Sequence, residues 1–428
     1  MQASKEAGTK GDPGTTIARF QAADRLPTID FMRHISMFFV FYCHFMVNWR
    51  APEFTSWLLF QWTILDFLGI TSFTGLSVIG NMLSYYKRVE KGDTRIVTPA
   101  LLTRAACLYA VAVPMNFVAQ GYMGGFVLLM GNVLTIIAIF SLLTPVVLQL
   151  DWRIRAAILG MLVASYYPLV SWAWGGLLAA GISPEGIQAV HLADPRVFVY
   201  YALVDHRMTA PLFTWLPIVF FVTIVFERFV KTQGKLSREG IARELRRIAV
   251  IGAIIAVASA IAGSTPSQGY IAGELANLTH PGFYFTWPVD WIPMFFVRNS
   301  TFMVVYNFGM FCLTFWFFGT IQLVHGKRFP AQEKLMNFGK LSLTGFLLSH
   351  IPYAIQIQIP FWPFYAIFIP IYILIIECFW RWTTRLRGVG TVEWVITIAS
   401  SFVTKTIERK RRVDEQGTRE KTKVMPVR

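Results

Sequence analysis

Long apolar runs, separated by short polar and basic segments, fill the chain between residues 27 and 387. Each run approaches the ~20 apolar residues that a helix needs to cross about 30 Å of hydrocarbon. We expect about ten spans, near residues 31–48, 57–84, 98–118, 125–149, 155–175, 209–227, 245–263, 301–324, 341–359 and 361–380, with a turn at Pro360 between the last two. The pattern predicts an all-α, polytopic transmembrane helix bundle.

The positions of lysine and arginine predict the orientation of this bundle. Of the 39 basic residues, 34 lie in the N-terminal tail, the C-terminal segment and the loops on one side of the predicted spans. The opposite side has Arg50, Arg196, Arg207 and Arg298. Cytoplasmic loops carry an excess of basic residues. We therefore expect both termini to lie in the cytoplasm.

Composition agrees with a membrane protein and changes the meaning of the charge. The 428 residues are 55% hydrophobic and 15% charged, and the mean hydropathy is +0.50. A net charge of +15 would suit nucleic acid, but its alternation between spans reports topology instead. The basic run 408–412 is interpreted as a patch that faces lipid headgroups. Membrane lipids are therefore the expected partners, and nucleic acid is not.

Three segments are expected along the chain. Residues 1–26 are polar, lack the apolar core of a signal peptide and are predicted to be a disordered cytoplasmic tail. Residues 27–387 form the transmembrane domain, and residues 388–428 form an interfacial helix followed by a basic cytoplasmic tail. The long outer loops 176–208 and 264–300 are candidates for functional loops.

Two ionisable residues stand in the first predicted span. Arg33 and His44 are eleven residues apart, which places them on one helix face with an offset of roughly 20° and a separation of about 16 Å along the axis. An ionisable side chain within lipid is costly and usually faces a cavity or a partner. The alternative is that Arg33 reaches the headgroups and His44 is a packing residue.

Further polar residues lie in other predicted spans. Asp66 is expected at a depth between Arg33 and His44, where it can orient His44 and favour its cationic form. It can equally neutralise Arg33 in a simple interhelical ion pair. His350, near mid-membrane, is either part of the same site or a hydrogen-bonding residue between helices. Arg104 lies near an inner end, where it can snorkel, pair or bind an anionic ligand.

Several other classes of site are disfavoured by the sequence. The seven histidines are scattered without metal-binding spacing, so no metal is expected. A phosphate-binding G-x-x-x-x-G-K-[ST] loop is absent from the sequence, which argues against ATP-driven transport. The four cysteines lie in apolar stretches and are interpreted as thiols without a disulfide framework.

Several stretches together resemble a known family. Residues 25–35 read RLPTIDFMRHI, and an Arg, ten residues and a His follow from Arg33 to His44. This is similar to the first helix of the transmembrane acyltransferases, which include acyltransferase family 3 and the heparan-alpha-glucosaminide N-acetyltransferases. Residues 64–83, 131–143 and 339–350 also resemble helices of related membrane proteins, as does RGVGTVEW at 387–394.

The sequence departs from the family pattern at three places. His34 stands where the family has Gly, and Val389 stands where the closing signature has Pro. Residues 54–63 read FTSWLLFQWT and lack the His-x-x-Trp-Asn-Gly of the N-acetyltransferase branch. The fold remains the expectation, while the acceptor remains open.

The resemblance implies an acyltransferase in a membrane, with the plasma membrane expected. An acyl group, with acetyl expected, would pass from cytoplasmic acyl-CoA to a hydroxyl or amine of a glycan or lipid at the outer side, as in O-acetylation. The oligomeric state is open. The alternative is a proton-coupled transporter or a flippase that uses the same polar site, and a scaffold without activity is a third possibility.

Roles for the polar residues follow from that reaction. His44 is the candidate general base or transient acyl carrier, since the ordinary pKa of a histidine lies near neutrality. Asp66 would orient it, and His350 would complete the catalytic group. The donor would bind at Asp30, Arg33 and Arg104, because the predicted topology places these residues near the cytoplasmic side.

Overall fold

The computed structural model describes residues 26–49, 64–120, 132–182, 187, 189–204, 211–233, 235–264, 293, 300–355 and 357–423. Every regular element in these ranges is a helix, so the predicted all-α class is confirmed for the part of the chain that is described. The expected tail at 1–26, apart from its last residue, and most of the outer loop 264–300 lie outside the described residues.

Helices of very different lengths follow one another along the chain. In order, they are α2 (Pro27–Trp49), η2 (Asp66–Leu68), α4 (Ile70–Glu90), α5 (Pro99–Gln120), α6 (Val133–Val147), α7 (Trp152–Ala180), η4 (Ala189–Ala193), α8 (Pro195–Val199), η5 (Tyr200–Val204), α9 (Leu212–Trp215), α10 (Pro217–Lys231), α11 (Arg238–Ala262), α13 (Thr301–Gly319), η8 (Thr320–Val324), α14 (Gln332–Lys340), α15 (Ser342–Leu348), α16 (Ile351–Ala354), α17 (Phe361–Arg385) and α18 (Val392–Lys423).

Capping side chains explain where several helices begin. Asn132, Asp151, Ser237 and Ser300 directly precede α6, α7, α11 and α13, and each accepts a hydrogen bond of 2.8 to 3.2 Å from a backbone N–H of the first turn. These N–H groups have no partner within the helix itself. At the other end of α7, Gly181 adopts φ 63° and closes the helix in the left-handed conformation.

Six helices in the described ranges are long and apolar enough to cross a membrane. They cover Asp66–Glu90, Trp152–Ala180, Leu212–Lys231, Arg238–Ala262, Thr301–Val324 and Phe361–Arg385. Shorter apolar helices run through Pro99–Met115 and Val133–Val147. The structure therefore supports a multi-pass membrane protein, and the count of about ten spans stays a prediction.

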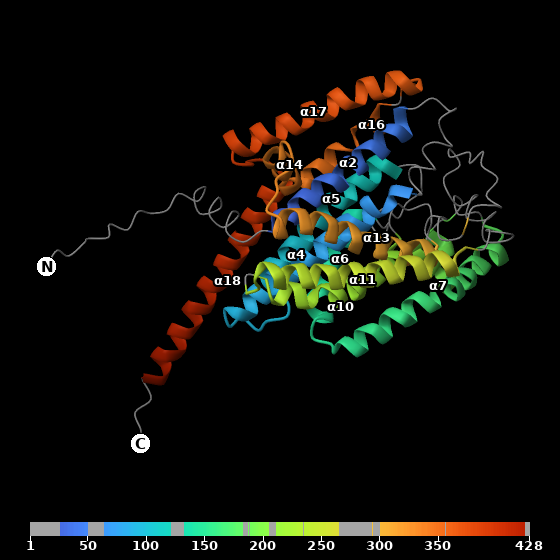
Figure 1. Cartoon of the computed structure of the whole chain (residues 1–428). Coiled ribbons are helices and arrows are strands. Elements are labelled where there is room, and N and C mark those ends of the chain that lie inside the picture. The colour runs from blue at the N-terminus through green and yellow to red at the C-terminus, as the bar shows by residue number, and fades with distance from the viewer. Residues whose placement is uncertain are drawn as a thin grey trace.

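Helix α2 lies in the interior, between α17 on one side of the molecule and the helices that lead to α7 on the opposite side (Figure 1). Most of its residues are buried. Helix α17 runs antiparallel to it: the hydroxyls of Tyr42 and Tyr365 are 2.7 Å apart, and the rings of His34 and Tyr372 lie 5.9 Å apart. The helix that carries Arg33 and His44 is thus surrounded by protein.

Helices α14 and α15 follow α2 in the parallel direction. A Cβ on Gly339 would meet the backbone oxygen of Asp30, and a Cβ on Gly345 would lie 3.6 Å from the side chain of Met37. Further along, Ser349 hydrogen-bonds to His44. The contacts therefore advance together along both segments, from the start of α2 towards its end.

The prediction of a single helix over 341–359 is wrong. The structure has α15 and α16 there, with Ser349 and His350 between them. Pro352 explains the break, because it has no N–H to bond with the carbonyl of Leu348 and its ring clashes with that carbonyl in a continuous helix. The interruption is important because it places two polar residues at the point where the helix ends.

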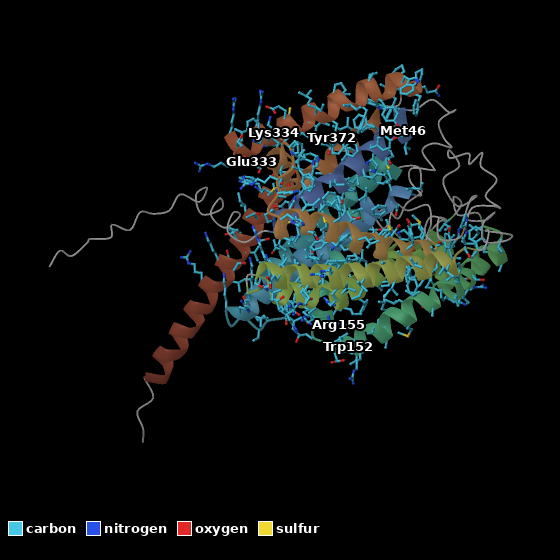
Figure 2. The ribbon with its side chains drawn as sticks, in the orientation of Figure 1. Met46, Trp152, Arg155, Glu333, Lys334 and Tyr372 are labelled. Carbon is cyan, nitrogen blue, oxygen red and sulfur yellow. The ribbon has the colours of Figure 1, made fainter. Side chains whose placement is uncertain are left out.

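A buried ion pair ties three helices together. Arg155 of α7 is 3% exposed and donates to the backbone oxygen of Thr223 at 3.0 Å and to Glu227 Oε2 of α10 at 2.5 Å. Tyr86 of α4 donates to Glu227 Oε1 at 2.6 Å. Figure 2 shows Arg155 beside Trp152, at the start of α7. Helices α4, α7 and α10 are therefore held together at these ends.

Helix α18 extends to Lys423, further along the chain than the expected interfacial helix. Figure 1 shows it leaving the bundle at an angle. Its first half packs on α5, where the Ser400 hydroxyl donates to the backbone oxygen of Ala100 at 3.4 Å. Val395, Ile398 and Phe402 remain exposed, and this apolar stripe is consistent with the predicted contact with lipid.

Candidate active site

His44 is held by Ser349. The Nδ1 atom of His44 lies 3.0 Å from the backbone oxygen of Ser349 and 3.0 Å from its Oγ. A carbonyl oxygen only accepts hydrogen bonds, so Nδ1 of His44 must carry the proton. In the neutral form of a ring with this tautomer, Nε2 is the nitrogen that can accept a proton. His44 is half-buried, so this nitrogen belongs to a side chain that is not sealed in the core.

His350 lies directly beside His44. The two ring centroids are 4.5 Å apart in an edge-to-face arrangement. Nδ1 of His350 donates to the backbone oxygen of Phe346 at 2.8 Å, so the same argument places a proton on this Nδ1. The structure therefore brings together two of the predicted catalytic residues, His44 and His350, in the same tautomer.

The helix break makes this arrangement possible. In a continuous helix, the carbonyl of Phe346 would bond to the backbone N–H of His350. Here the backbone N–H of His350 donates to the backbone oxygen of Leu347 at 3.1 Å instead. The freed carbonyl accepts from the Ser349 hydroxyl at 2.7 Å and from the ring of His350. Backbone and side chains thus fix both imidazoles.

Aromatic rings surround the two histidines. The ring of Tyr353 lies 5.3 Å from His44 and 5.5 Å from His350, and the ring of Phe346 lies 6.2 Å and 4.9 Å from them. An apolar neighbourhood of this kind strengthens hydrogen bonds and electrostatic interactions relative to water. We call His44, Ser349, His350 and Tyr353 the histidine cluster.

Asp66 lies in η2, just before the start of α4. It is 4% exposed and accepts a hydrogen bond of 2.9 Å from Asn307 Nδ2 of α13. Gly69 follows with φ −79° and ψ −112°, which interrupts the helix between η2 and α4. The side chain that orients Nδ1 of His44 is Ser349, and the expected pairing of Asp66 with His44 stays a prediction.

Two of the predicted donor-binding residues, Asp30 and Arg33, lie near the start of α2. Asp30 and Arg33 are 3.8 Å apart, and a Cβ on Gly80 of α4 would lie 3.1 Å from the Arg33 guanidinium. Since α2 is one continuous helix, Arg33 and His44 are about 16 Å apart along it. Arg104 is half-buried in α5. The structure thus brings Asp30 and Arg33 together.

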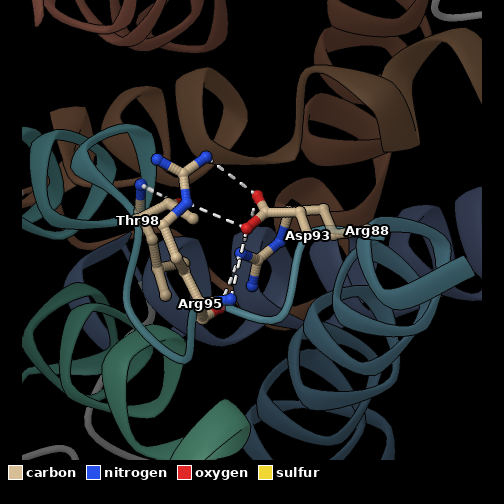
Figure 3. A network of polar contacts seen from close by, with 5 residues as sticks. Arg88, Asp93, Arg95 and Thr98 are labelled. Carbon is tan, nitrogen blue, oxygen red and sulfur yellow. Dashed lines mark hydrogen bonds and ion pairs between the residues drawn. The ribbon is translucent and has the colours of Figure 1, made fainter. Parts of the chain in front are cut away.

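The basic loop between α4 and α5 has its own ionic network (Figure 3). Arg95 Nε donates to Asp93 at 2.8 Å, and Arg88 lies 3.8 Å from the same carboxylate. The hydrogen bond from Arg95 lowers the pKa of Asp93 below its ordinary value. Asp93 therefore stays ionised and folds part of this positive loop back on itself.

Sequence reasoning missed Ser349 and Asn307, the residues that bond to His44 and Asp66. Their separations along the chain, 305 residues for His44 and Ser349 and 241 for Asp66 and Asn307, leave no local signal. A usable signal existed only for Ser349, which directly precedes His350 and stands three residues before Pro352. In the described residues, no group of three or more His, Cys, Asp or Glu side chains is placed to hold a metal ion.

The comparisons with known proteins bear on this geometry. Residues 25–191 match the family profile described as "Heparan-alpha-glucosaminide N-acetyltransferase, catalytic". The resemblance to a transmembrane acyltransferase family, predicted from the sequence, is thereby confirmed for 167 of the 428 residues. No curated protein and no solved structure matches the chain.

The matched region extends from α2 through α7 and includes His44, Asp66 and Arg33. His350 and Ser349 lie beyond it. The chain is therefore similar to a membrane acetyltransferase catalytic domain in the part that supplies one of the two histidines, and the fold brings the second histidine to it from the end of α15.

Proposed function

We propose that this protein is an integral membrane acyltransferase that moves an acetyl group from acyl-CoA to a hydroxyl or amine of a glycan or lipid. The observation that carries the proposal is the contact of His44, on a helix within the region that matches an acetyltransferase family, with Ser349 and His350. Acyl transfer needs a base for the acceptor, and a neutral imidazole that carries its proton on Nδ1 can take a further proton on Nε2.

The chemistry assigned to His44 is general-base catalysis. Nε2 takes the proton from the acceptor O–H or N–H while the acceptor atom attacks the thioester carbonyl. The new C–O or C–N bond forms, the C–S bond breaks, and the proton passes from His44 to the departing thiolate, which leaves as free thiol. His350, whose ring centroid lies 4.5 Å from that of His44, provides a second imidazole that can share the proton.

The donor is proposed to reach this cluster from the cytoplasm. Asp30, Arg33 and Arg104 would bind its polar part, with Arg33 pairing with phosphate oxygens. Figure 2 shows Met46, two residues after His44, towards the opposite end of the bundle from Glu333 and Lys334. That arrangement supports a donor side at the basic ends and an acceptor side near the histidine cluster.

The topology belongs to the same proposal. Both termini and the loops 85–104 and 228–247 are placed in the cytoplasm, because 34 of the 39 basic residues lie on that side of the expected spans. A single cysteine introduced at the exposed Thr94, in a protein whose four native cysteines are replaced, should label only after the membrane is permeabilised. Labelling from outside intact cells would contradict the proposed orientation and the proposed direction of transfer. The plasma membrane is the proposed location.

Transfer of labelled acetyl tests the reaction itself. Purified protein in nanodiscs would receive acetyl-CoA labelled in the acetyl group, with a panel of membrane lipids and glycans as acceptors. We expect label on at least one acceptor with the wild type, and a loss of about 10²- to 10⁴-fold with His44→Asn, as for removal of a general base. His44→Asn is chosen because its amide N–H can still bond to Ser349.

The rival function has a clear signature in proteoliposomes. A proton-coupled transporter or flippase would move a glycan- or lipid-like solute when a pH gradient is applied, and His44→Asn would stop that movement. Such transport, together with no acetyl transfer above background on any acceptor, would overturn the proposed function.

A further inference from the structure

Helix α15 begins without a cap of its own. Leu341 precedes it, with φ −103° and ψ 32°, and provides no capping side chain. Instead, Glu393 Oε1 accepts from the backbone N–H of Leu343 at 2.6 Å and from that of Thr344 at 3.4 Å. Glu393 belongs to α18, so a carboxylate from one helix satisfies the free N–H groups of another.

The capping is reciprocal. The Thr344 hydroxyl donates to Glu393 Oε2 at 2.6 Å and accepts from the backbone N–H of Val392, the first residue of α18, at 2.9 Å. Each helix thus caps the start of the other. Desolvation at this junction raises the pKa of Glu393, and the hydrogen bonds from Thr344 and the backbone oppose that shift.

This junction lies at the opposite end of α15 from the histidine cluster. Helix α15 has seven residues, or about 10 Å of helix, and Ser349 and His350 follow its last residue directly. Along its length it packs on α2, where Gly345 approaches Met37. A short helix that is fixed at its start has little freedom at its end, because its backbone hydrogen bonds make it nearly rigid.

We propose that Glu393 is a positioning residue for the histidine cluster. By capping α15 from α18, it sets where Ser349 and His350 stand against His44. Its hydrogen bonds to Leu343 and Thr344 involve no histidine, so it acts through the helix. The kinetic part of the test rests on the proposed acyltransferase function, whereas the spectroscopic part does not.

Two pairs of variants isolate the carboxylate and the hydroxyl. Glu393→Ala removes both acceptors, while Glu393→Gln keeps one oxygen for the backbone N–H of Leu343. Thr344→Val removes the hydroxyl at nearly constant volume, while Thr344→Ser keeps it. Glu333→Ala is the matched control, because it removes an exposed carboxylate from the neighbouring helix α14 (Figure 2).

The readout that is independent of activity is the ¹⁵N spectrum of protein labelled at histidine. Loss of the resonances in His44→Asn and His350→Asn assigns the two rings, and in the wild type both should have the proton on Nδ1. We expect Glu393→Ala to shift or broaden both sets of signals. Glu393→Gln, Thr344→Ser and Glu333→Ala should leave them close to wild type. Where Glu393→Ala yields no folded protein, Thr344→Val takes its place.

The kinetic readout is acetyl transfer per folded molecule. We expect Glu393→Ala to lower kcat at least 10-fold with an unchanged KM for acetyl-CoA, and Glu393→Gln to recover most of the loss. Unchanged histidine signals and unchanged kcat in Glu393→Ala and Thr344→Val would overturn the positioning role. Shifted histidine signals in a protein whose wild type transfers no acetyl would support the positioning role and contradict the proposed function instead.

Discussion

Gly339→Ala tests the close contact of α14 with α2, the helix that carries His44. Gly339 is the last residue but one of α14, and a Cβ there would meet the backbone oxygen of Asp30 on α2, far inside van der Waals distance. Ordinary contacts of a Cβ begin at 3.4 Å. The two backbones must therefore move apart, since neither backbone atom can rotate away as a side chain can.

The expected cost combines two effects of opposite sign. Overpacking of a well-packed interior costs about 1–3 kcal/mol, and the clash with a backbone atom favours the upper part of that range. Alanine gains about 0.5–1 kcal/mol over glycine within a helix. We expect a net loss of about 2 kcal/mol in the free energy of unfolding, and a slower acetyl transfer because α14 leads into α15.

Thermal unfolding in one detergent, followed by intrinsic fluorescence, measures this effect. Gly160→Ala on α7 is the control, because nothing lies within 4 Å of a Cβ at that position. It should leave Tm unchanged or raise it, while Gly339→Ala should lower it by several degrees. Equal Tm values for the two variants would refute the close approach of α14 to α2.

Three further predictions concern polar residues. Ser349→Ala should slow acetyl transfer less than 10-fold, because the Ser349 carbonyl still holds His44. Asp66→Ala should lower stability by about 1–3 kcal/mol, since it leaves the buried Asn307 amide unpaired, and Asn307→Leu should restore part of that loss in the double variant, both read by thermal unfolding. Desolvation raises the pKa of Glu393 above 4.5, so ionisation of this residue costs more free energy in the folded than in the unfolded protein. The stability that this pKa shift contributes is complete below pH 4.5 and is lost as the pH rises through the folded-state pKa. The Tm of Glu393→Gln should therefore gain on that of the wild type over this pH range.

The helical fold was predictable because its cause is local. The apolar run that predicts a span over 31–48 becomes α2, which begins a turn earlier, at Pro27. Proline is favoured in the first turn of a helix, and Asp30 places a negative charge there. Arg33 and His44 therefore lie on one helix, as the spacing predicts.

The composition of the site was less predictable, because its cause is not local. The broken helix at Ser349 was signalled by Pro352, but the hydrophobicity of the run favoured one continuous span. The bond of Ser349 to Nδ1 of His44 depends on the packing of segments that are 305 residues apart along the chain. Asp66 has in turn a partner on α13. The spacing of residues in the sequence predicts which side chains share a helix face, but the neighbouring helix on that face depends on tertiary packing.

Release of free thiol from acetyl-CoA tests the central claim most directly. A thiol-reactive chromophore would report thiol release by the purified wild type, His44→Asn and the surface control Glu333→Ala, each with the acceptor in excess. Binding of labelled acetyl-CoA would measure the affinity for the donor. We predict thiol release with the wild type and Glu333→Ala, and a rate at least 100-fold lower with His44→Asn at unchanged donor affinity. Equal rates in the wild type and His44→Asn, or no release above background in the wild type, would contradict an acyltransferase with His44 as its base.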